Sequence, residues 1–265
     1  MNSSYPKTLA IINAIGLIGV IGINALANAL PINGITTGEL SDLYPNLFVP
    51  AGITFSIWAL IYVLLILFIV NQFAAIKSSE TQAISSIEQI GPWFFISCSA
   101  NILWIFAWHY QLLLLSLVLI LLIGLSLIMM YLRLDIGRTQ VSPRTKFLVY
   151  LPVSVYLGWI SVAVIANVTA VLVFYGWNGF TLSESFWTVL VIIAGILVGL
   201  AMLYLRKDIF HPLVVVWAYF GIIMKRSADS IPYTAVIAAA WAGVAVLIFL
   251  IIVQIVRKQT YIHSH

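Results

Sequence analysis

Long runs of apolar residues, separated by short polar segments, make up most of the chain. A membrane-spanning helix needs about 20 consecutive, mostly apolar residues, and several runs approach or exceed that length. Because lipid cannot hydrogen-bond to the backbone, each run must pair its own peptide groups, as a helix does. The pattern therefore predicts an all-α membrane protein, a polytopic bundle of about eight transmembrane helices. We place the spans at residues 9–30, 50–73, 92–110, 112–133, 146–175, 185–205, 209–224 and 231–256.

The composition leads to the same fold class. Apolar residues make up 63% of the chain and charged residues only 8%, whereas about a quarter of the residues in soluble domains are charged. The bilayer must therefore be the solvent for most of the surface. The net charge of +4 comes from basic residues that stand singly or in pairs at the ends of apolar runs. Nucleic-acid binding needs such residues clustered on one face, so we expect no nucleic-acid partner.

The distribution of Lys and Arg predicts the orientation, because cytoplasmic loops are richer in these residues. Basic residues gather before the first span, after the fourth and sixth spans and at the C-terminal end, whereas loop 31–49 carries acids and no base. We predict that both termini are cytoplasmic, that loop 31–49 lies outside, and that the membrane is the plasma membrane. Lys225 and Arg226 would then face outward, so either the rule fails there or segment 209–224 does not fully cross.

Small residues recur at helical spacing in several spans. Gly195 and Gly199 form a GxxxG pair, and Gly16, Gly19 and Gly22 lie along one side of the first span. Small residues let helix backbones approach closely in lipid. These faces fit contacts within the bundle or between the two copies of a homodimer, and the spacing does not distinguish the two.

Ionisable residues inside spans usually mark functional sites in membrane proteins, but here every Asp and Glu falls in a loop or at a helix end. This argues against transport coupled to buried carboxylates. It also argues against a catalytic or metal-binding cluster, so we expect neither enzyme activity nor a metal site. Cys98, in an apolar run, is expected to be a small core residue. His109 and His211, near helix ends, are expected to be solvated or capping residues.

Neutral polar and aromatic residues follow the helical repeat in three spans. An amide at mid-bilayer depth must find a partner, so two such stripes facing each other would enclose an aromatic pocket with polar handles. The alternatives are asparagines that join helices and tryptophans at the membrane interface, which is the role we expect for Trp93, Trp177 and Trp187. The stripes are Trp58 and Tyr62 in the second span, Asn101, Trp104 and Trp108 in the third, and Tyr156, Trp159, Ala163 and Asn167 in the fifth.

These stripes resemble motifs of the translocator protein family, also called tryptophan-rich sensory proteins. Four motifs occur in the family's order on the corresponding spans, which is more specific than any motif alone. The resemblance covers about residues 9–175. The matching residues are Tyr44, Leu47 and Pro50 in the first loop, Trp58 and Tyr62, Asn101 and Trp104, and Tyr156, Leu157, Trp159, Ala163 and Asn167.

The resemblance implies a five-helix bundle with a cavity for hydrophobic molecules such as porphyrins, haem or sterols. The cavity would lie beneath loop 31–49, which we call the lid. The chain would divide into a five-helix domain at residues 1–177 and a three-helix extension at residues 178–265. A porphyrin or haem would be a ligand, and no resident cofactor is implied. The implied ligand-binding residues are Trp58, Tyr62, Asn101, Trp104, Tyr156, Trp159, Ala163 and Asn167.

The chain departs from the family motifs near the lid. Val49 stands in the place of the motif lysine, and Leu43 stands in the place of the tryptophan beside Tyr44. The segment between Pro50 and Trp58 lacks the double proline and tryptophan of the family, so part of the lid is deleted. These departures weaken the case for porphyrin photochemistry, which in the family uses a tryptophan of this region.

Three hypotheses follow. The leading one is a non-enzymatic membrane sensor or receptor that binds a hydrophobic small molecule. The second is a transporter or permease subunit for small lipophilic or neutral solutes. The third, an enzyme acting on a lipid or porphyrin, is disfavoured because the spans carry no buried acid, base or metal cluster. A cavity shared by Asn101 and Asn167 would support the first.

Overall fold

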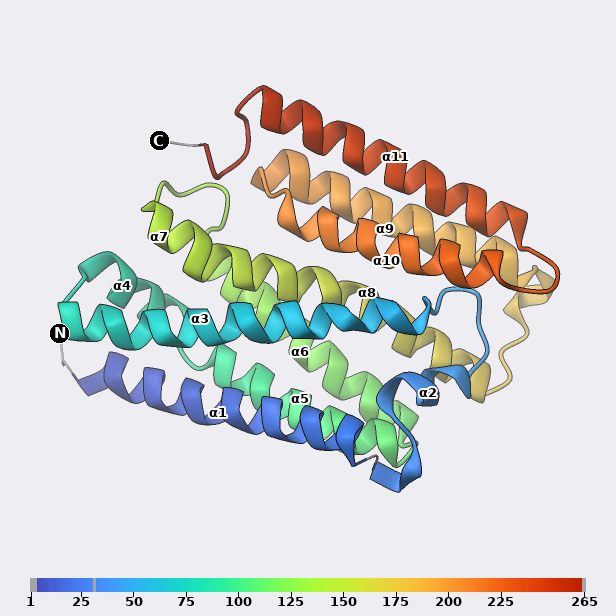
Figure 1. The fold of residues 1–265 in the computed structure, drawn as a ribbon, viewed down its shortest axis with the longest axis horizontal. Coiled ribbons are helices and arrows are strands. Elements are labelled where there is room, and N and C mark those ends of the chain that lie inside the picture. Colours follow the sequence, from blue (N-terminus) through green and yellow to red (C-terminus); the bar gives the residue numbers. More distant parts are fainter. Residues whose placement is uncertain (1–3, 31, 264–265) are drawn as a thin grey trace.

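The computed structural model describes residues 4–30 and 32–263, and its long elements are all helices (Figure 1). The helices lie roughly along one direction, with both termini at one end of the bundle and the lid at the other. We call these the terminal end and the lid end. The prediction of an all-α polytopic bundle is confirmed. The long helices are α1 (Ser4–Ala29), α3 (Ile57–Ser78), α5 (Trp93–His109), α6 (Leu113–Arg133), α8 (Leu151–Phe174), α9 (Glu184–Arg206), α10 (Phe210–Ser227) and α11 (Thr234–Val256).

Short elements connect the long helices. The sequence pattern missed α4 (Thr81–Ile90), which buries Ala83, Ile87 and Ile90 on one face and is bent by 49° from α5. Its mixed apolar and polar composition kept it out of a search for continuous apolar runs. The other short elements are α2 (Thr37–Asp42), α7 (Pro143–Thr145), the π-helical turn Lys146–Tyr150, and 3₁₀ turns at Ile32–Gly34, Gly52–Ser56 and Gly179–Thr181.

Within the described residues, six helices are long and apolar enough to cross a membrane, and a seventh span results if α4 and α5 count as one. The sequence pattern predicted about eight spans. The difference is α10, which carries His211 near its start and Lys225 and Arg226 in its last turn. It nevertheless runs between the same two ends of the bundle as its neighbours (Figure 1). It packs against α8, α9 and α11.

One apolar core runs through the whole bundle. It includes Leu17 of α1, Phe94 of α5, Ile123 of α6, Tyr219 of α10 and Leu247 of α11. The core therefore continues across residue 177, where the sequence analysis divides the chain into two domains. That division stays a prediction.

The glycines of the C-terminal helices are used inside the chain. A Cβ atom at Gly195 would overlap the hydroxyl of Tyr219, and one at Gly243 would lie 2.9 Å from the ring of the same tyrosine. Gly16 on α1 faces Cys98 of α5 in the same way, which confirms Cys98 as a buried core residue. At Gly16 and Gly195 these contacts decide a question that the spacing left open, because there the small residues join helices within one bundle. A Cβ atom at Gly22, in contrast, would meet nothing within 4 Å. A homodimer stays a prediction.

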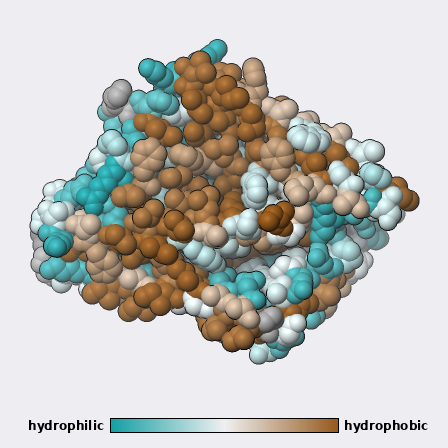
Figure 2. Space-filling model, viewed as in Figure 1, coloured by the Kyte–Doolittle hydropathy of each residue, from teal (hydrophilic) through white to brown (hydrophobic). Residues whose placement is uncertain are grey.

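The outer surface suits a lipid environment. Figure 2 shows hydrophobic residues over the middle of this face and hydrophilic ones gathered mainly toward its edges. Large apolar side chains such as Ile18, Val118 and Phe249 are well exposed. In water such a surface would be costly, whereas in a bilayer it faces acyl chains of equal polarity.

Charged residues pair at the two ends of the bundle. At the lid end, Lys225 pairs with Asp42 and Arg226 pairs with Asp229 at 3.3 Å. At the terminal end, Arg206 pairs with Asp135 at 2.9 Å. Lys225 and Arg226, the two basic residues at the lid end, are thus partly neutralised by neighbouring acids.

Candidate functional site

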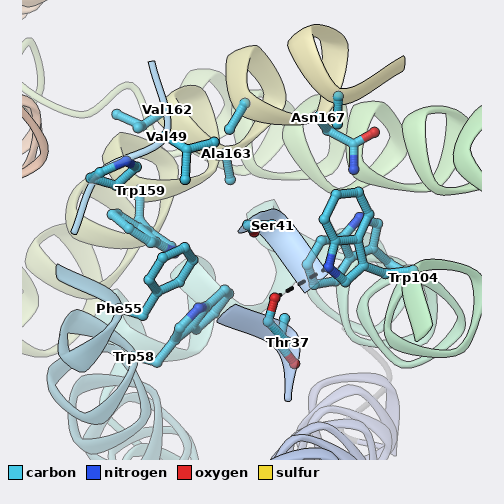
Figure 3. Close-up of a pocket in the computed structure, with 14 residues that line it drawn as sticks. Thr37, Ser41, Val49, Phe55, Trp58, Trp104, Trp159, Val162, Ala163 and Asn167 are labelled. Atoms are coloured by element: carbon cyan, nitrogen blue, oxygen red, sulfur yellow. Dashed lines mark hydrogen bonds between the residues drawn. The ribbon is translucent and has the colours of Figure 1, made fainter. Parts of the chain in front are cut away.

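A cavity lies at the lid end between the lid, the turn Gly52–Ser56, and helices α3, α5 and α8. In Figure 3, Phe55, Trp58 and Trp159 stand on one side, Trp104 and Asn167 stand on the other, and Thr37 and Ser41 lie between them. The cavity volume is about 50 Å³. The lining residues are Thr37, Ser41, Val49, Pro50, Phe55, Trp58, Trp104, Trp108, Trp159, Val162, Ala163, Ala166, Asn167 and Ala170.

One stripe of α8 forms the longest wall of the cavity. Trp159, Ala163 and Asn167 lie one turn apart, as the sequence pattern predicted. The stripe continues through Ala166 and Ala170, which lie on the same face. Because alanine side chains are small, they leave space where larger residues would fill it. The helical repeat of α8 thus sets both the indole and the amide against one hollow.

Aromatic rings form the two ends of the cavity. Trp104 and Trp108 of α5 stack with ring centroids 5.8 Å apart. On the other side, Trp159 meets Phe55 edge-on at 5.8 Å and Trp58 edge-on at 6.4 Å. Such contacts add to the burial of each ring. The two ends of the cavity are therefore flat and apolar.

Three hydrogen-bond donors of side chains that line the cavity lack partners. Within the described part of the chain, no acceptor bonds Trp104 Nε1, Trp159 Nε1 or Asn167 Nδ2, and all three atoms are buried. The other end of the Asn167 amide is occupied, since its Oδ1 accepts from Ser116 Oγ at 3.2 Å. A buried donor without a partner costs roughly 1–3 kcal/mol. The three side chains all line the same cavity.

Asn101 does not line this cavity. Its Oδ1 accepts from Asn24 Nδ2 at 2.9 Å, and its Nδ2 donates to the hydroxyl of Tyr156 at 3.3 Å. Only 1% of Asn101 is exposed. The residue thus links α1, α5 and α8, which is the helix-joining alternative of the sequence analysis. Asn167 lines the cavity, and Asn101 does not.

Tyr156 and Tyr62 contact Trp58 but do not line the cavity. The ring of Tyr62 stacks on Trp58 at 5.6 Å, and the ring of Tyr156 meets Trp58 edge-on at 5.9 Å. Neither tyrosine belongs to the cavity lining. Of the eight predicted ligand-binding residues, the structure brings Trp58, Trp104, Trp159, Ala163 and Asn167 to the cavity and leaves Tyr62, Asn101 and Tyr156 outside it.

A second hollow lies on the other side of Trp58 and Trp104, between α1, α2 and α3. It contains Tyr62 and the amide of Asn24, and it shares Thr37 and Phe55 with the first cavity. The indoles of Trp58 and Trp104 therefore stand between the two hollows. Movement of these rings would join them.

The lid is fixed to α5 by polar contacts. His109 Nε2 lies 3.0 Å from Thr37 Oγ1, and Nδ1 lies 3.1 Å from the carbonyl oxygen of Ile32. Trp108 Nε1 donates to the carbonyl oxygen of Thr37 at 3.3 Å. The expectation of a solvated or capping His109 was wrong, because the lid covers the ring and bonds to it.

Local capping holds the short helix of the lid. Thr36 and Glu39 form a capping box, in which each side chain accepts from the backbone N–H of the other. These hydrogen bonds, first from the Thr36 backbone and then from its hydroxyl, lower the pKa of Glu39. The pair therefore starts α2 at Thr37 and places Thr37 and Ser41 over the cavity.

His211 was also expected to be solvated or capping, and this was wrong. It is buried where α10 begins, with Nε2 3.4 Å from Ser161 Oγ. A Cβ atom at Gly158 would lie 3.0 Å from the carbonyl oxygen of His211, so glycine lets α8 and α10 approach closely here. The neighbouring Asp208 is fully buried in the connection between α9 and α10, and it accepts from Tyr131 at 3.0 Å and from the N–H of Phe210 at 2.9 Å.

Sequence reasoning missed the lining residues from the lid and the turn Gly52–Ser56. No periodicity marks Thr37, Ser41 or Phe55, because they come from short turns and not from a long helix. Ala166 lies beside Asn167 on the stripe of α8, and Ala170 could have been found by continuing that stripe through one more turn. Trp108 belongs to the predicted stripe of the third span but is not among the ligand-binding residues that the resemblance implies.

The fold and the cavity together define a class: a polytopic all-helical membrane protein with an aromatic-walled cavity beneath a short lid. The family of TSPO-like proteins matches the chain over residues 10–253, and the chain belongs to this family. The match continues beyond residue 175, where the motif resemblance ended, and includes α9, α10 and most of α11. No match was found among curated proteins or among solved structures.

Proposed function

We propose that this integral membrane protein binds a hydrophobic small molecule, porphyrin-like or sterol-like, in the cavity beneath the lid. The proposal rests on the three unpartnered donors of Trp104, Trp159 and Asn167, which line one aromatic hollow. A ligand with carbonyl or similar acceptor atoms would pair these donors and remove the cost of leaving them unmade. The proposal includes no chemical step.

The lining favours a neutral ligand. None of the described residues that line the cavity carries a charge, and Val49 stands where the family motif has a lysine. A carboxylate buried there would lack a counter-charge, which is costly in an apolar site. We therefore expect esters or ketones of these ring systems to bind more tightly than the free acids.

The cavity must widen for such a ligand. Pockets for drug-sized ligands usually offer several hundred Å³, whereas this cavity offers about 50 Å³. Displacement of the lid, or rotation of Trp58 and Trp104 toward the second hollow, would supply the missing volume. Binding is thus expected to be slow relative to diffusion.

Titration tests the proposal directly. Purified protein in lipid nanodiscs is titrated with protoporphyrin IX and with its dimethyl ester, and tryptophan fluorescence is recorded. We expect saturable quenching, with the ester bound more tightly. A sterol ketone serves as a third probe, and it should displace the porphyrin ester if both occupy the same site.

Two variants locate the site. Trp159→Phe and Trp104→Phe keep an aromatic ring and remove one donor each, so affinity for the ester should fall by about twofold to tenfold. Trp241→Phe is the matched control, because Trp241 lies on α11 with 48% of its surface exposed. Equal affinity in all three variants, or no saturable quenching by any probe, would disprove the proposal.

A transporter or permease subunit is the second candidate. The two hollows that flank Trp58 and Trp104 favour it, because a solute could pass between them when the indoles move. Flux of the same probes into liposomes, compared with empty vesicles, distinguishes transport from binding alone.

A further inference from the structure

Helix α10 contacts the lid and the segment around the turn Gly52–Ser56, which form one wall of the cavity, at three successive turns. We call this wall the front of the cavity. Trp217 Nε1 donates to the carbonyl oxygen of Thr54 at 2.9 Å, and the carbonyl oxygen of Gly221 accepts from the N–H of Ala51 at 3.0 Å. One turn further, Lys225 Nζ forms an ion pair with Asp42 of the lid. Residues spaced by four lie on one face of a helix. This face of α10 therefore follows the chain from the turn Gly52–Ser56 to the lid.

The middle contact requires glycine. A Cβ atom at Gly221 would overlap Thr54 Oγ1 and would lie 2.8 Å from Pro50 Cβ. Thr54 is buried, so it has little room to move away. Any larger residue at position 221 would push the turn Gly52–Ser56 away from α10.

The contacted segment is also the front wall of the cavity. Val49, Pro50 and Phe55 line the cavity, and Ser41 precedes Asp42 in α2. Helix α10 contributes none of the lining residues among those described. Its influence on the cavity therefore acts through the position of the lid and the turn.

We propose that α10 is a positioning element that holds the lid and the turn Gly52–Ser56 closed over the cavity, with Gly221 and Lys225 as its positioning residues. The ligand-binding side of this inference rests on the proposed function. Two contacts hold the lid and the turn closed. The close packing at Gly221 is the strong contact, and the ion pair of Lys225 is the weak one. The ion pair is weak because the side chain of Asp42 is 63% exposed to solvent, and exposed pairs contribute little.

Access to a cysteine inside the cavity measures closure without any ligand. Ala166→Cys places a thiol on the cavity wall, and the single native cysteine, Cys98, is buried between helices. The protein in nanodiscs is treated with a charged, water-soluble maleimide, and the labelling rate of the A166C thiol is recorded. Unsubstituted protein, carrying only Cys98, gives the background rate.

We expect slow labelling in A166C alone. Adding Lys225→Ala should raise the rate by roughly twofold to fivefold, and the charge exchange Lys225→Asp with Asp42→Lys should restore it. Adding Gly221→Ala should raise the rate by roughly tenfold or more, because overpacking displaces the turn. Gly22→Ala on α1 is the matched control, since a Cβ atom there meets nothing within 4 Å.

The outcomes separate this inference from the proposed function. Equal labelling rates in the Lys225 and Gly221 variants and in the control would overturn it, as would failure of the charge exchange to restore slow labelling. If Gly221→Ala does not give folded protein, the labelling rates of the Lys225 variants alone test the positioning role. Faster labelling in both variants supports the positioning role even if no porphyrin ester binds, in which case only the proposed function fails.

Discussion

At the scale of single residues, two asparagines with similar sequence settings have different surroundings. Asn101 and Asn167 both lie in an apolar span near tryptophans at helical spacing. Asn101 uses both ends of its amide to join three helices, whereas Asn167 leaves its Nδ2 unpaired on a cavity wall. The residue type is the same, and the neighbours brought by other helices decide the role.

The contrast predicts opposite effects of substitution. Asn101→Leu should lower the thermal stability, by about 1 kcal/mol of unfolding free energy, with little change in the affinity for the porphyrin ester. Asn167→Leu should lower that affinity more than the stability. Thermal unfolding and titration in the same detergent measure both. If Asn101→Leu abolishes binding while the protein remains as stable as before, the assignment of the two roles is wrong.

Asp208 predicts a pH dependence. Burial, which outweighs the hydrogen bonds to the carboxylate, raises its pKa above the usual value for Asp. The folded state then holds the proton at pH values where the unfolded chain has lost it, so stability should fall as the pH rises through this window. Melting temperatures measured from about pH 4 upward should show that fall. In Asp208→Asn this fall in the melting temperature with rising pH should vanish. A pH profile equal to that of the unsubstituted protein would contradict the argument.

At the scale of elements, α9, α10 and α11 pack around the buried ring of Tyr219. Its hydroxyl donates to the carbonyl oxygen of Ile192 at 2.6 Å and faces Gly195. We expect Gly195→Ala to destabilise the protein by roughly 1–3 kcal/mol through overpacking. Tyr219→Phe should recover part of that loss in the double variant, because the clash involves the hydroxyl oxygen. Thermal unfolding of both single variants and the double variant gives the coupling, and strict additivity would refute the packing argument.

The elements also show where periodicity works and where it fails. Apolar runs predicted the long helices α1, α3, α5, α6, α8, α9, α10 and α11, because a spanning helix has to be mostly apolar along its length. The same rule missed α4, which is amphipathic, and it could not describe the turns that form the front of the cavity. Those turns owe their shape to capping at Thr36 and to contacts with α5 and α10.

At the scale of the whole molecule, the arrangement of the ends, together with the distribution of Lys and Arg, predicts the topology. Cysteine variants at Thr181 and Asp229 should react with a membrane-impermeant maleimide in intact cells, since both lie in connections at the lid end (Figure 1). Variants at Arg138 and Gln259, at the terminal end, should react only after permeabilisation. Labelling of Asp229→Cys together with the terminal-end sites would show that α10 does not cross. Native Cys98 is buried and should give little background.

The sequence by itself determined the fold class, the positions of most helices and the aromatic stripe of α8. It could do so because a bilayer imposes length and polarity on every span, and because a helix brings residues three and four apart onto one face. Only the tertiary structure decided which stripes share a cavity, which glycines pack inside the chain, and that α10 lies against the front of that cavity. Those facts depend on how distant helices are arranged around one another, and no local pattern of residues encodes that arrangement.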